Sequence, residues 1–203
     1  MSSGTLFVIS APSGTGKTSL VKALVTKLDN IQTSVSFTTR EPRAGEVDGQ
    51  HYVFVDEAKF LRYQEESRFL ESAQVFKNWY GTSKDWVEEK LQSGLDVILE
   101  IDWQGARIVK SMLPCVTVFI IPPSKADLKD RLMARRQDKD DVIDFRMQKA
   151  NEELSHYKEY DYLVVNDDFE QAVAELSCVV SAQRLTTGNQ AKNHRKLLNE
   201  LLT

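Results

Sequence analysis

The sequence predicts an α/β domain built around a mostly parallel sheet. Apolar segments of strand length at 96–101, 116–121 and 161–166 are typical of central strands covered on both faces. Segments of helical character lie between and after them, and such alternation of strand and helix is the pattern of βαβ units. The length of 203 residues suits one domain with inserted lobes.

The elements follow in chain order. A β-rich run at 5–10 leads into a loop of small residues and then into a helix at 20–28, where apolar residues recur at helical spacing. Further helices are expected at 83–94, 105–113, 124–136, 140–160 and 168–185, with a last amphipathic helix at 189–202.

Residues 34 to 82 interrupt this alternation because they are polar, rich in turn residues and β-leaning. We expect them to form an inserted, partly antiparallel α+β lobe, and a second polar stretch that contains RRQDKDD to form a mobile helical lid. The single domain then divides into a core (1–33, 85–126 and 151–203), a lobe (34–84) and a lid (127–150).

Charge and composition narrow the classes of function. A net charge of −4 argues against non-specific nucleic-acid binding, but arginines gather around 40–43 and 131–146, which indicates a small, highly charged anion. No apolar run reaches the roughly 18 to 20 residues of a membrane span, and the first ten residues do not resemble a signal peptide, so we expect a cytoplasmic protein. Cys115 and Cys178 are expected to be buried, reduced thiols, and His156 a surface group.

The segment APSGTGKTS matches the last three positions of the phosphate-binding loop G-x-x-x-x-G-K-[ST], and it lies between a predicted strand and a predicted helix. Ala11 stands at the usual first glycine and requires a negative φ there. Backbone N–H groups of such a loop surround phosphate oxygens, while Lys17 reaches the β- and γ-phosphates and Thr18 offers its hydroxyl to Mg²⁺. We therefore expect a nucleoside triphosphate to be bound by Ala11, Pro12, Ser13, Gly14, Thr15, Gly16, Lys17, Thr18 and Ser19.

A second set of motifs follows the loop: SVSFTTREPRAGE at 34–46 and GQHYVFV at 49–55. Together with FLE (69–71), NWYGT (78–82), DWQG (102–105), PPS (122–124) and VNDD (165–168), they closely resemble the guanylate kinase family over about residues 5 to 185. The resemblance implies an ATP:GMP phosphotransferase of purine nucleotide metabolism, with Mg²⁺ as cofactor and with ATP and GMP as its small-molecule partners.

By this resemblance, the GMP phosphate is bound by Arg40, Arg43, Tyr52 and Tyr80, whose guanidinium and phenol groups are good donors to a phosphate. The alternative is that the arginines pair with Glu41 and Glu46 on a solvated turn.

The resemblance also assigns the guanine pocket. A carboxylate can accept from both N1–H and N2–H of guanine and a hydroxyl can serve O6, and these roles fall to Glu71 and Ser36. Thr82 and Asp102 are expected to join them, while Asn166 is expected near the adenine of ATP.

Two acids close the strand when it is taken as the segment DVILEID (96–102). Glu100 and Asp102 are two residues apart, so on a strand both would point to one face, at the carboxyl edge of the sheet. An acid at this place can hold Mg²⁺ directly or through water. The family usually has Asp where this chain has Glu100, which leaves that residue's metal role open.

The lid carries the remaining arginines. Arg131 and Arg135 are four residues apart and share a helix face, and Arg146 follows about three turns later. The resemblance implies that these three close on the transferring phosphoryl group with Lys17 as the catalytic set, and the alternative is salt bridges with aspartates of the lid. Arg136 is an extra charge without an assigned role.

Phosphoryl transfer needs mainly positioning and charge neutralisation, so we expect direct in-line attack of GMP without an essential general base. Three alternatives remain: a non-catalytic protein-binding module of the same family, a kinase of another nucleoside monophosphate, and a P-loop hydrolase. Intact Gly16, Lys17 and Thr18 argue against the first, and the two acceptor sites argue against the others. The oligomeric state and the acceptance of dGMP stay open.

Overall fold

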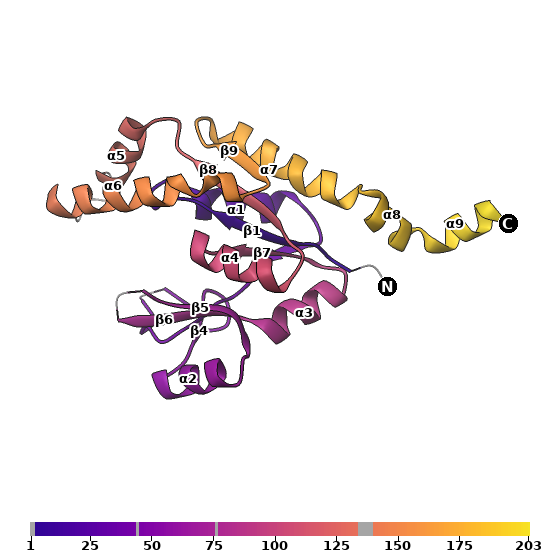
Figure 1. Ribbon diagram of the computed structural model, residues 1–203, viewed down its shortest axis with the longest axis horizontal. Helices are drawn as coiled ribbons and strands as arrows, with labels where there is room; N and C mark the ends of the chain where they lie inside the picture. The colour runs from indigo at the N-terminus through magenta and orange to yellow at the C-terminus, as the bar shows by residue number, and fades with distance from the viewer. Residues whose placement is uncertain (1–2, 44, 76, 134–139) are drawn as a thin grey trace.

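Five parallel strands form the core sheet, in the order β2-β7-β1-β8-β9. The protein is seen here as a computed structural model, which describes residues 3–43, 45–75, 77–133 and 140–203. The strands are β1 (Leu6–Ser10), β2 (Ile31–Thr33), β7 (Asp96–Glu100), β8 (Val116–Ile121) and β9 (Tyr162–Val165). The prediction of an α/β fold with a mostly parallel sheet is therefore confirmed (Figure 1).

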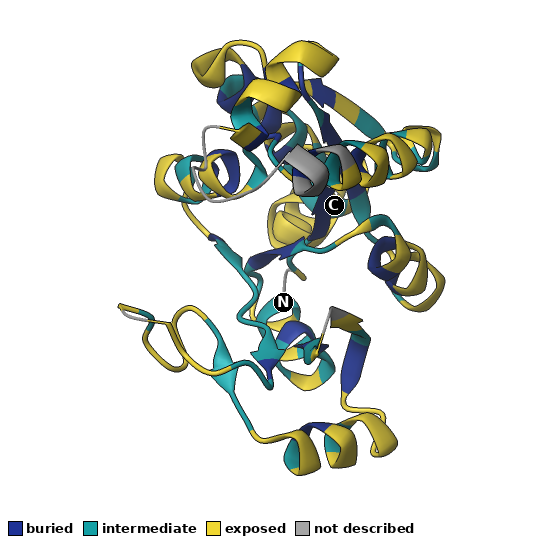
Figure 2. Ribbon diagram, turned by 90° about the vertical axis from the view of Figure 1, so that its left-hand side faces the viewer, coloured by how far each residue is buried: buried dark blue, intermediate teal, exposed yellow. Residues whose placement is uncertain are grey.

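Alternation along the central strand builds both halves of the core. Phe7 and Ile9 of β1 pack with α1 (Lys17–Lys27) and α7 (Phe169–Arg184) on one face of the sheet. Leu6 and Val8 pack with α3 (Lys84–Gln92) and α4 (Trp103–Met112) on the other face. All five residues of β1 are buried, as expected for a strand covered on both sides (Figure 2).

A second, four-stranded sheet lies within the segment that the sequence sets apart as a lobe. Its order is β4-β3-β6-β5, formed by β3 (Phe37–Thr38), β4 (Val53–Phe54), β5 (Phe69–Val75) and β6 (Asn78–Ser83). Strands β5 and β6 are antiparallel, and α2 (Glu57–Glu65) covers the sheet through Phe60, which is fully buried and stacks on Phe69.

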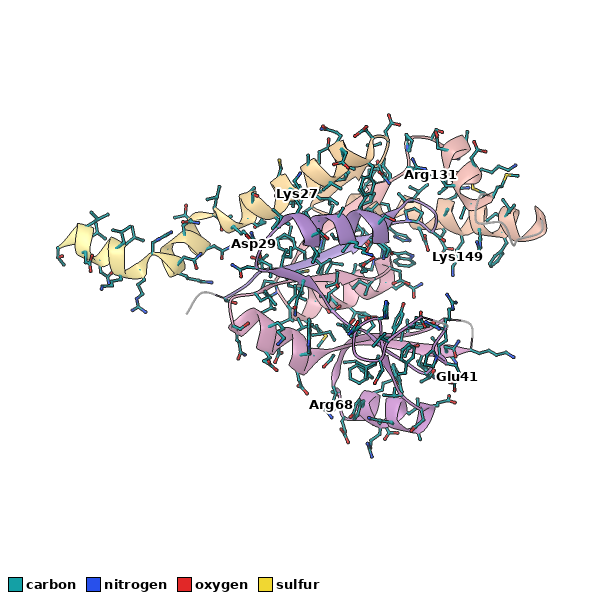
Figure 3. All side chains as sticks on the ribbon, turned by 180° about the vertical axis from the view of Figure 1, so that it is seen from behind. Lys27, Asp29, Glu41, Arg68, Arg131 and Lys149 are labelled. Atoms are coloured by element: carbon teal, nitrogen blue, oxygen red, sulfur yellow. The ribbon has the colours of Figure 1, made fainter. Side chains whose placement is uncertain are left out.

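Two helices beyond β8 carry Arg131 and Arg146, two of the arginines of the expected lid. They are α5 (Lys125–Met133) and α6 (Asp140–Ser155), which pack together through Leu128, Leu132 and Ala150. Helix α6 ends five residues before the predicted end at 160, and a 3₁₀ turn, η1 (Tyr157–Glu159), leads into β9. Figure 3 shows Arg131 and Lys149 on these two helices.

The C-terminal part differs from the prediction in two ways. The single helix expected at 189–202 is two helices, α8 (Thr187–Asn193) and α9 (Arg195–Leu202), which extend away from the core (Figure 1). Cys178 is exposed, since it lies on the outer side of α7, and Cys115 is half-buried, so the prediction of two buried thiols was wrong. Among the described residues, no helix is both long and apolar enough to cross a membrane.

Candidate active site

The P-loop connects the end of β1 to the start of α1, and its backbone geometry requires two glycines. Gly14 and Gly16 have φ angles of 92° and 97°, which other residues rarely adopt. A Cβ atom on Gly16 would also lie 2.7 Å from the Asn166 Nδ2 atom. Ala11 is not among the described residues with positive φ, so the condition for alanine at this position is met. The first turn of α1 begins at Lys17, which places the helix N-terminus at the loop.

Two side chains from other elements hold the Thr15 carbonyl. The Asn166 amide donates to it at 2.6 Å, and the Arg131 Nη1 atom donates to it at 3.3 Å. Arg131 also donates to the Asn166 carbonyl at 3.0 Å. Asn166 is buried, so it supports the loop from the protein interior. Asn166, which was predicted near the adenine, and Arg131, which was predicted in the catalytic set, thus both contact the loop.

Lys17 and Thr18 face carboxylates at the carboxyl edge of the sheet. The Thr18 hydroxyl donates to Glu100 Oε2 at 3.1 Å. Burial lowers the pKa of Lys17, while the nearby carboxylates of Glu100, Asp102 and Glu153 act in the opposite direction. The lysine is thus a partly desolvated cation close to three acids.

The oxygen atoms of Thr18 and Glu100 suit a magnesium ion that arrives with a nucleotide. Mg²⁺ prefers oxygen ligands and usually takes only one or two from a protein, with phosphates and water completing the shell. Among the described residues, no group of three or more His, Cys, Asp or Glu side chains could hold a metal by itself. The residues therefore fit Mg²⁺ bound together with phosphates.

A cleft of about 650 Å³ joins the P-loop to the lobe. Its walls include Lys17, Thr18, Glu100, Ser36 and Tyr52, which come from predicted donor, metal and acceptor sets. The sequence interpretation gave no role to several other polar residues that line it, among them Lys22, Thr33 and Gln50.

Arg40, Tyr52 and Tyr80 form one cluster on the lobe. The Arg40 guanidinium lies 5.4 Å from the centre of the Tyr52 ring, and the rings of Tyr52 and Tyr80 are 6.0 Å apart. Arg40 also forms an ion pair with Glu46 at 2.8 Å, which raises the pKa of Arg40. This is the pairing that the alternative interpretation named. The Arg40 side chain is only 14% exposed, although most of the described residues around it in the turn are exposed.

Arg43 lies apart from this cluster. Its side chain is exposed, and its backbone N–H donates to Glu46 at 2.7 Å. Glu46 therefore holds the loop that carries both arginines, and the pKa of Glu46 is lowered mainly by the hydrogen bond from Arg40.

Glu71 is positioned between the second sheet and the start of α4. It pairs with Thr82 across β5 and β6, and the Thr82 hydroxyl donates to Glu71 Oε1 at 2.6 Å. The other oxygen, Oε2, lies close to Gly105: a Cβ atom added to this glycine would be 3.4 Å from it. Burial raises the pKa of Glu71, with a further contribution from the charge of Asp102. Glu71 is thus a half-buried carboxylate, not an exposed acid at the end of an element.

The sequence interpretation expected Asp102 to share a strand with Glu100, but the structure shows that it does not. Strand β7 ends at Glu100, and Asp102 is the N-cap of α4, where its carboxylate accepts from the Gly105 N–H at 2.9 Å. As the N-cap, Asp102 belongs to the start of α4 and not to β7, because its side chain must turn back to accept from the first helical turn. The charge of Asp102 nevertheless acts on both Lys17 and Glu71.

Two of the predicted lid arginines, Arg131 and Arg146, lie in the described part of the chain. Arg131 contacts the P-loop as described above, and Arg146 is half-buried on α6. Arg135 and Arg136 lie outside the described residues.

A cluster that the sequence did not reveal joins α4 to η1. The rings of Trp103 and His156 stack at 3.7 Å with an angle of 13° between their planes. Glu159 accepts from His156 at 2.7 Å and from two nitrogens of Arg107 at 2.6 and 2.5 Å. His156 is therefore a packed residue and not a surface group, and only its neighbours in space could reveal this.

A P-loop that shares a cleft with a second cluster of anion-binding side chains defines the protein as a P-loop nucleotide-binding enzyme of α/β type with two substrate sites. Comparison with known proteins agrees. The family described as "Guanylate kinase" matches residues 3–183. The chain therefore belongs to the guanylate kinase family.

Relatives with this name cover the whole chain. The guanylate kinases of Legionella pneumophila (strain Lens) and Methylococcus capsulatus are each 54% identical, over 99% and 100% of this chain and over 97% and 100% of their own lengths. A crystal structure of guanylate kinase from Anaplasma phagocytophilum is 36% identical and covers 92% of this chain, while 89% of that chain is covered. Its TM-score of 0.75 shows that the fold is shared.

Proposed function

We propose that the P-loop of this chain binds Mg·ATP and that the lobe binds GMP, with phosphoryl transfer in the cleft between them. As a member of the guanylate kinase family, the chain is an ATP-dependent kinase of GMP that produces ADP and GDP. The observation that supports this assignment of sites is the single cleft lined by Lys17 and Thr18 on one side and by Ser36 and Tyr52 on the other.

The donor side follows from the loop. Residues 11–19 direct backbone N–H groups and the N-terminus of α1 at the phosphates of ATP. Lys17 compensates the charge that develops on the γ-phosphoryl group, and its partial desolvation strengthens this interaction. Asn166 and Arg131 hold the Thr15 carbonyl and so fix the loop at the nucleotide end.

On the acceptor side, different residues bind the phosphate and the base of GMP. Arg40, Arg43, Tyr52 and Tyr80 bind the GMP phosphate, and Arg40 exchanges part of its bond to Glu46 for the phosphate.

Guanine lies against Glu71, which accepts from N1–H and N2–H, while Ser36 serves O6. Thr82 orients the Glu71 carboxylate by donating to its Oε1 atom, and Asp102 completes this end of the pocket. Adenine has an acceptor at N1, so it would leave the buried carboxylate unpaired.

In the reaction, a GMP phosphate oxygen attacks the γ-phosphorus in line with the bond to the β-phosphate oxygen. The new P–O bond forms as the old one breaks, and ADP departs with the bonding electron pair, so no group needs to remove a proton. Thr18 and Glu100 would hold Mg²⁺, which when bound neutralises phosphate charge. Arg131, Arg135 and Arg146 of the lid stabilise the transferring group, and closure of lobe and lid excludes water.

The proposal includes purine nucleotide metabolism in the cytoplasm as the setting, where the reaction returns GMP to the diphosphate pool. The test is a coupled ADP-release assay with Mg·ATP, with and without GMP. ADP that forms only with GMP, in a 1:1 ratio with GDP, supports the proposal. ADP formed without GMP indicates a hydrolase, and no ADP from a folded protein that binds GMP indicates a binding module.

A further inference from the structure

A stripe of side chains on α4 holds the short turn that follows α6. Trp103, Arg107 and Lys110 lie along one face of the helix. The Trp103 ring stacks on that of His156. Arg107 donates to the Glu159 carboxylate from two nitrogens, and Lys110 donates to the carbonyl of the same residue at 2.6 Å. The turn η1 therefore cannot shift on α4 without breaking several contacts at once.

His156 occupies the joint between α6 and this turn. Helix α6 ends at Ser155, and His156 is the N-cap of η1. Its side chain is only 16% exposed, with its ring stacked on Trp103 and its Nδ1 atom 2.7 Å from Glu159 Oε1. A carboxylate only accepts, so Nδ1 is the donor of this bond. The end of α6 is thus attached to α4 through a ring whose place and tilt are both fixed.

The two lid helices pack together and reach the P-loop. Leu128 and Leu132 of α5 form an apolar cluster with Ala150 of α6, which in the described part of the chain is separate from the two clusters of the core sheet. Next to Leu132 in the chain, Arg131 donates to the Thr15 carbonyl of the loop. Contacts therefore run without a break from the stacked rings through α6 and α5 to the loop, and such packed contacts transmit displacements.

The direction of α6 matters because the helix acts as a lever. The start of α6 projects beyond the sheet (Figure 1). The separation of Arg146 from His156 along the helix corresponds to about 15 Å, so a tilt of about 10° at His156 would move Arg146 by about 2.5 Å. Misplacement of a reacting or catalytic group by about 1 Å can cost about a hundredfold in rate.

We propose that the stacked rings of Trp103 and His156 are the fixed base of the lid, and that His156 is a positioning residue that sets the place of the lid arginines at the transferring phosphoryl group. The inference rests on the proposed function, which assigns Arg131 and Arg146 to that group. The base keeps its place while α5 and α6 move with the nucleotides, so it serves the transfer step and not the recognition of GMP.

Replacements of His156 separate the ring from its hydrogen bond. His156→Phe keeps a flat ring for Trp103 and removes the donor to Glu159. His156→Asn keeps an N–H donor close to the position of Nδ1 and removes the ring. His156→Ala removes both, and His194→Ala, at the exposed joint of α8 and α9, is the matched control.

The readouts distinguish positioning from stability. Coupled ADP release gives kcat and the KM values, calorimetric titration gives the Kd for GMP, and circular dichroism with melting curves shows that each variant is folded at the assay temperature. For His156→Ala we expect kcat to fall by about ten- to a hundredfold, while the Kd for GMP stays close to that of the wild type. His156→Phe should keep most of the wild-type kcat, His156→Asn should resemble His156→Ala, and His194→Ala should match the wild type.

A double variant tests whether the two rings act as one unit. Trp103→Leu combined with His156→Ala should lose no more kcat than the larger of the two single losses, because both changes remove the same contact. Losses that multiply would contradict a shared base.

Three other outcomes would overturn the inference. A wild-type kcat in folded His156→Ala, with only a lower melting temperature, would mean that the stack serves stability alone. Retention of kcat by His156→Asn and its loss in His156→Phe would assign the effect to the hydrogen bond, and this comparison also decides if His156→Ala does not fold. An equal loss in the Kd for GMP would place the effect in the acceptor pocket. Failure of the proposed function is seen separately, as a wild type without GMP-dependent turnover.

Discussion

Replacement of Glu71 by Gln tests the guanine pocket through two effects of opposite sign. The carboxylate accepts from Thr82 at 2.6 Å and keeps Oε2 near the start of α4, at the place assigned to guanine. An amide at this position can still accept one hydrogen bond, but its NH₂ group faces a guanine donor. The loss of one arm of a bidentate contact costs about 1–3 kcal/mol, which corresponds to a rise of about 5- to 150-fold in KM for GMP.

Stability should change in the other direction. Burial raises the pKa of Glu71, so its charged form is disfavoured in the folded state. A raised pKa means that the stability contributed by this group is fully present below 4.5, its ordinary value, and is lost as the pH rises through the folded-state pKa. Glu71→Gln removes the charge, so its melting temperature at pH 7 should exceed that of the wild type, and the difference should shrink as the pH falls toward 4.5, the ordinary value.

The assay measures KM for GMP and for ATP by coupled ADP release, and melting temperatures between pH 4 and pH 8. Glu66→Gln, at the exposed end of α2, is the matched control and should change neither. Equal losses for GMP and ATP, or a lower melting temperature at pH 7, would refute the reasoning that Glu71 is a strained, charged reader of guanine.

Three further changes test other parts of the molecule. Lys17→Ala should abolish transfer while circular dichroism stays that of the wild type, because the lysine serves phosphate and not the core. Gly16→Ala should lower the free energy of unfolding by more than about 1 kcal/mol and raise KM for ATP, since φ is 97° and the new Cβ would lie 2.7 Å from a buried amide. Glu159→Gln should lower the melting temperature at pH 7, because Arg107 first and a histidine second lower the pKa of Glu159 to about 2, and this stability is lost as the pH falls from 4.5 toward 2.

Each of these changes has its own control. Lys27→Ala, exposed at the end of α1, should keep full activity, and wild-type turnover in Lys17→Ala would contradict the P-loop assignment. Gly188→Ala adds a methyl group in open space on α8 and should raise stability by up to about 1 kcal/mol, so an equal effect of both glycine changes would contradict the argument from φ. If the melting temperature of Glu159→Gln differs from that of the wild type by the same amount at pH 7 and at pH 3, the ion pair is not the cause of the difference.

The sequence by itself determined the class of fold and the P-loop, because both depend on local pattern. The apolar runs at 96–101 and 116–121 became β7 and β8 within one residue. A three-residue edge strand such as β2 (Ile31–Thr33) is too short for any period to appear, so it was visible only in the structure.

The tertiary structure decided which side chains meet. Asn166 reaches Thr15 across 151 positions of the chain, and the ring of His156 stacks on Trp103. The sequence placed Asp102 on a strand, but the first turn of α4 takes it as a cap. Such contacts depend on how strands and helices pack in space, and residue spacing along the chain carries no record of that packing beyond one turn of helix or one pair of strand positions.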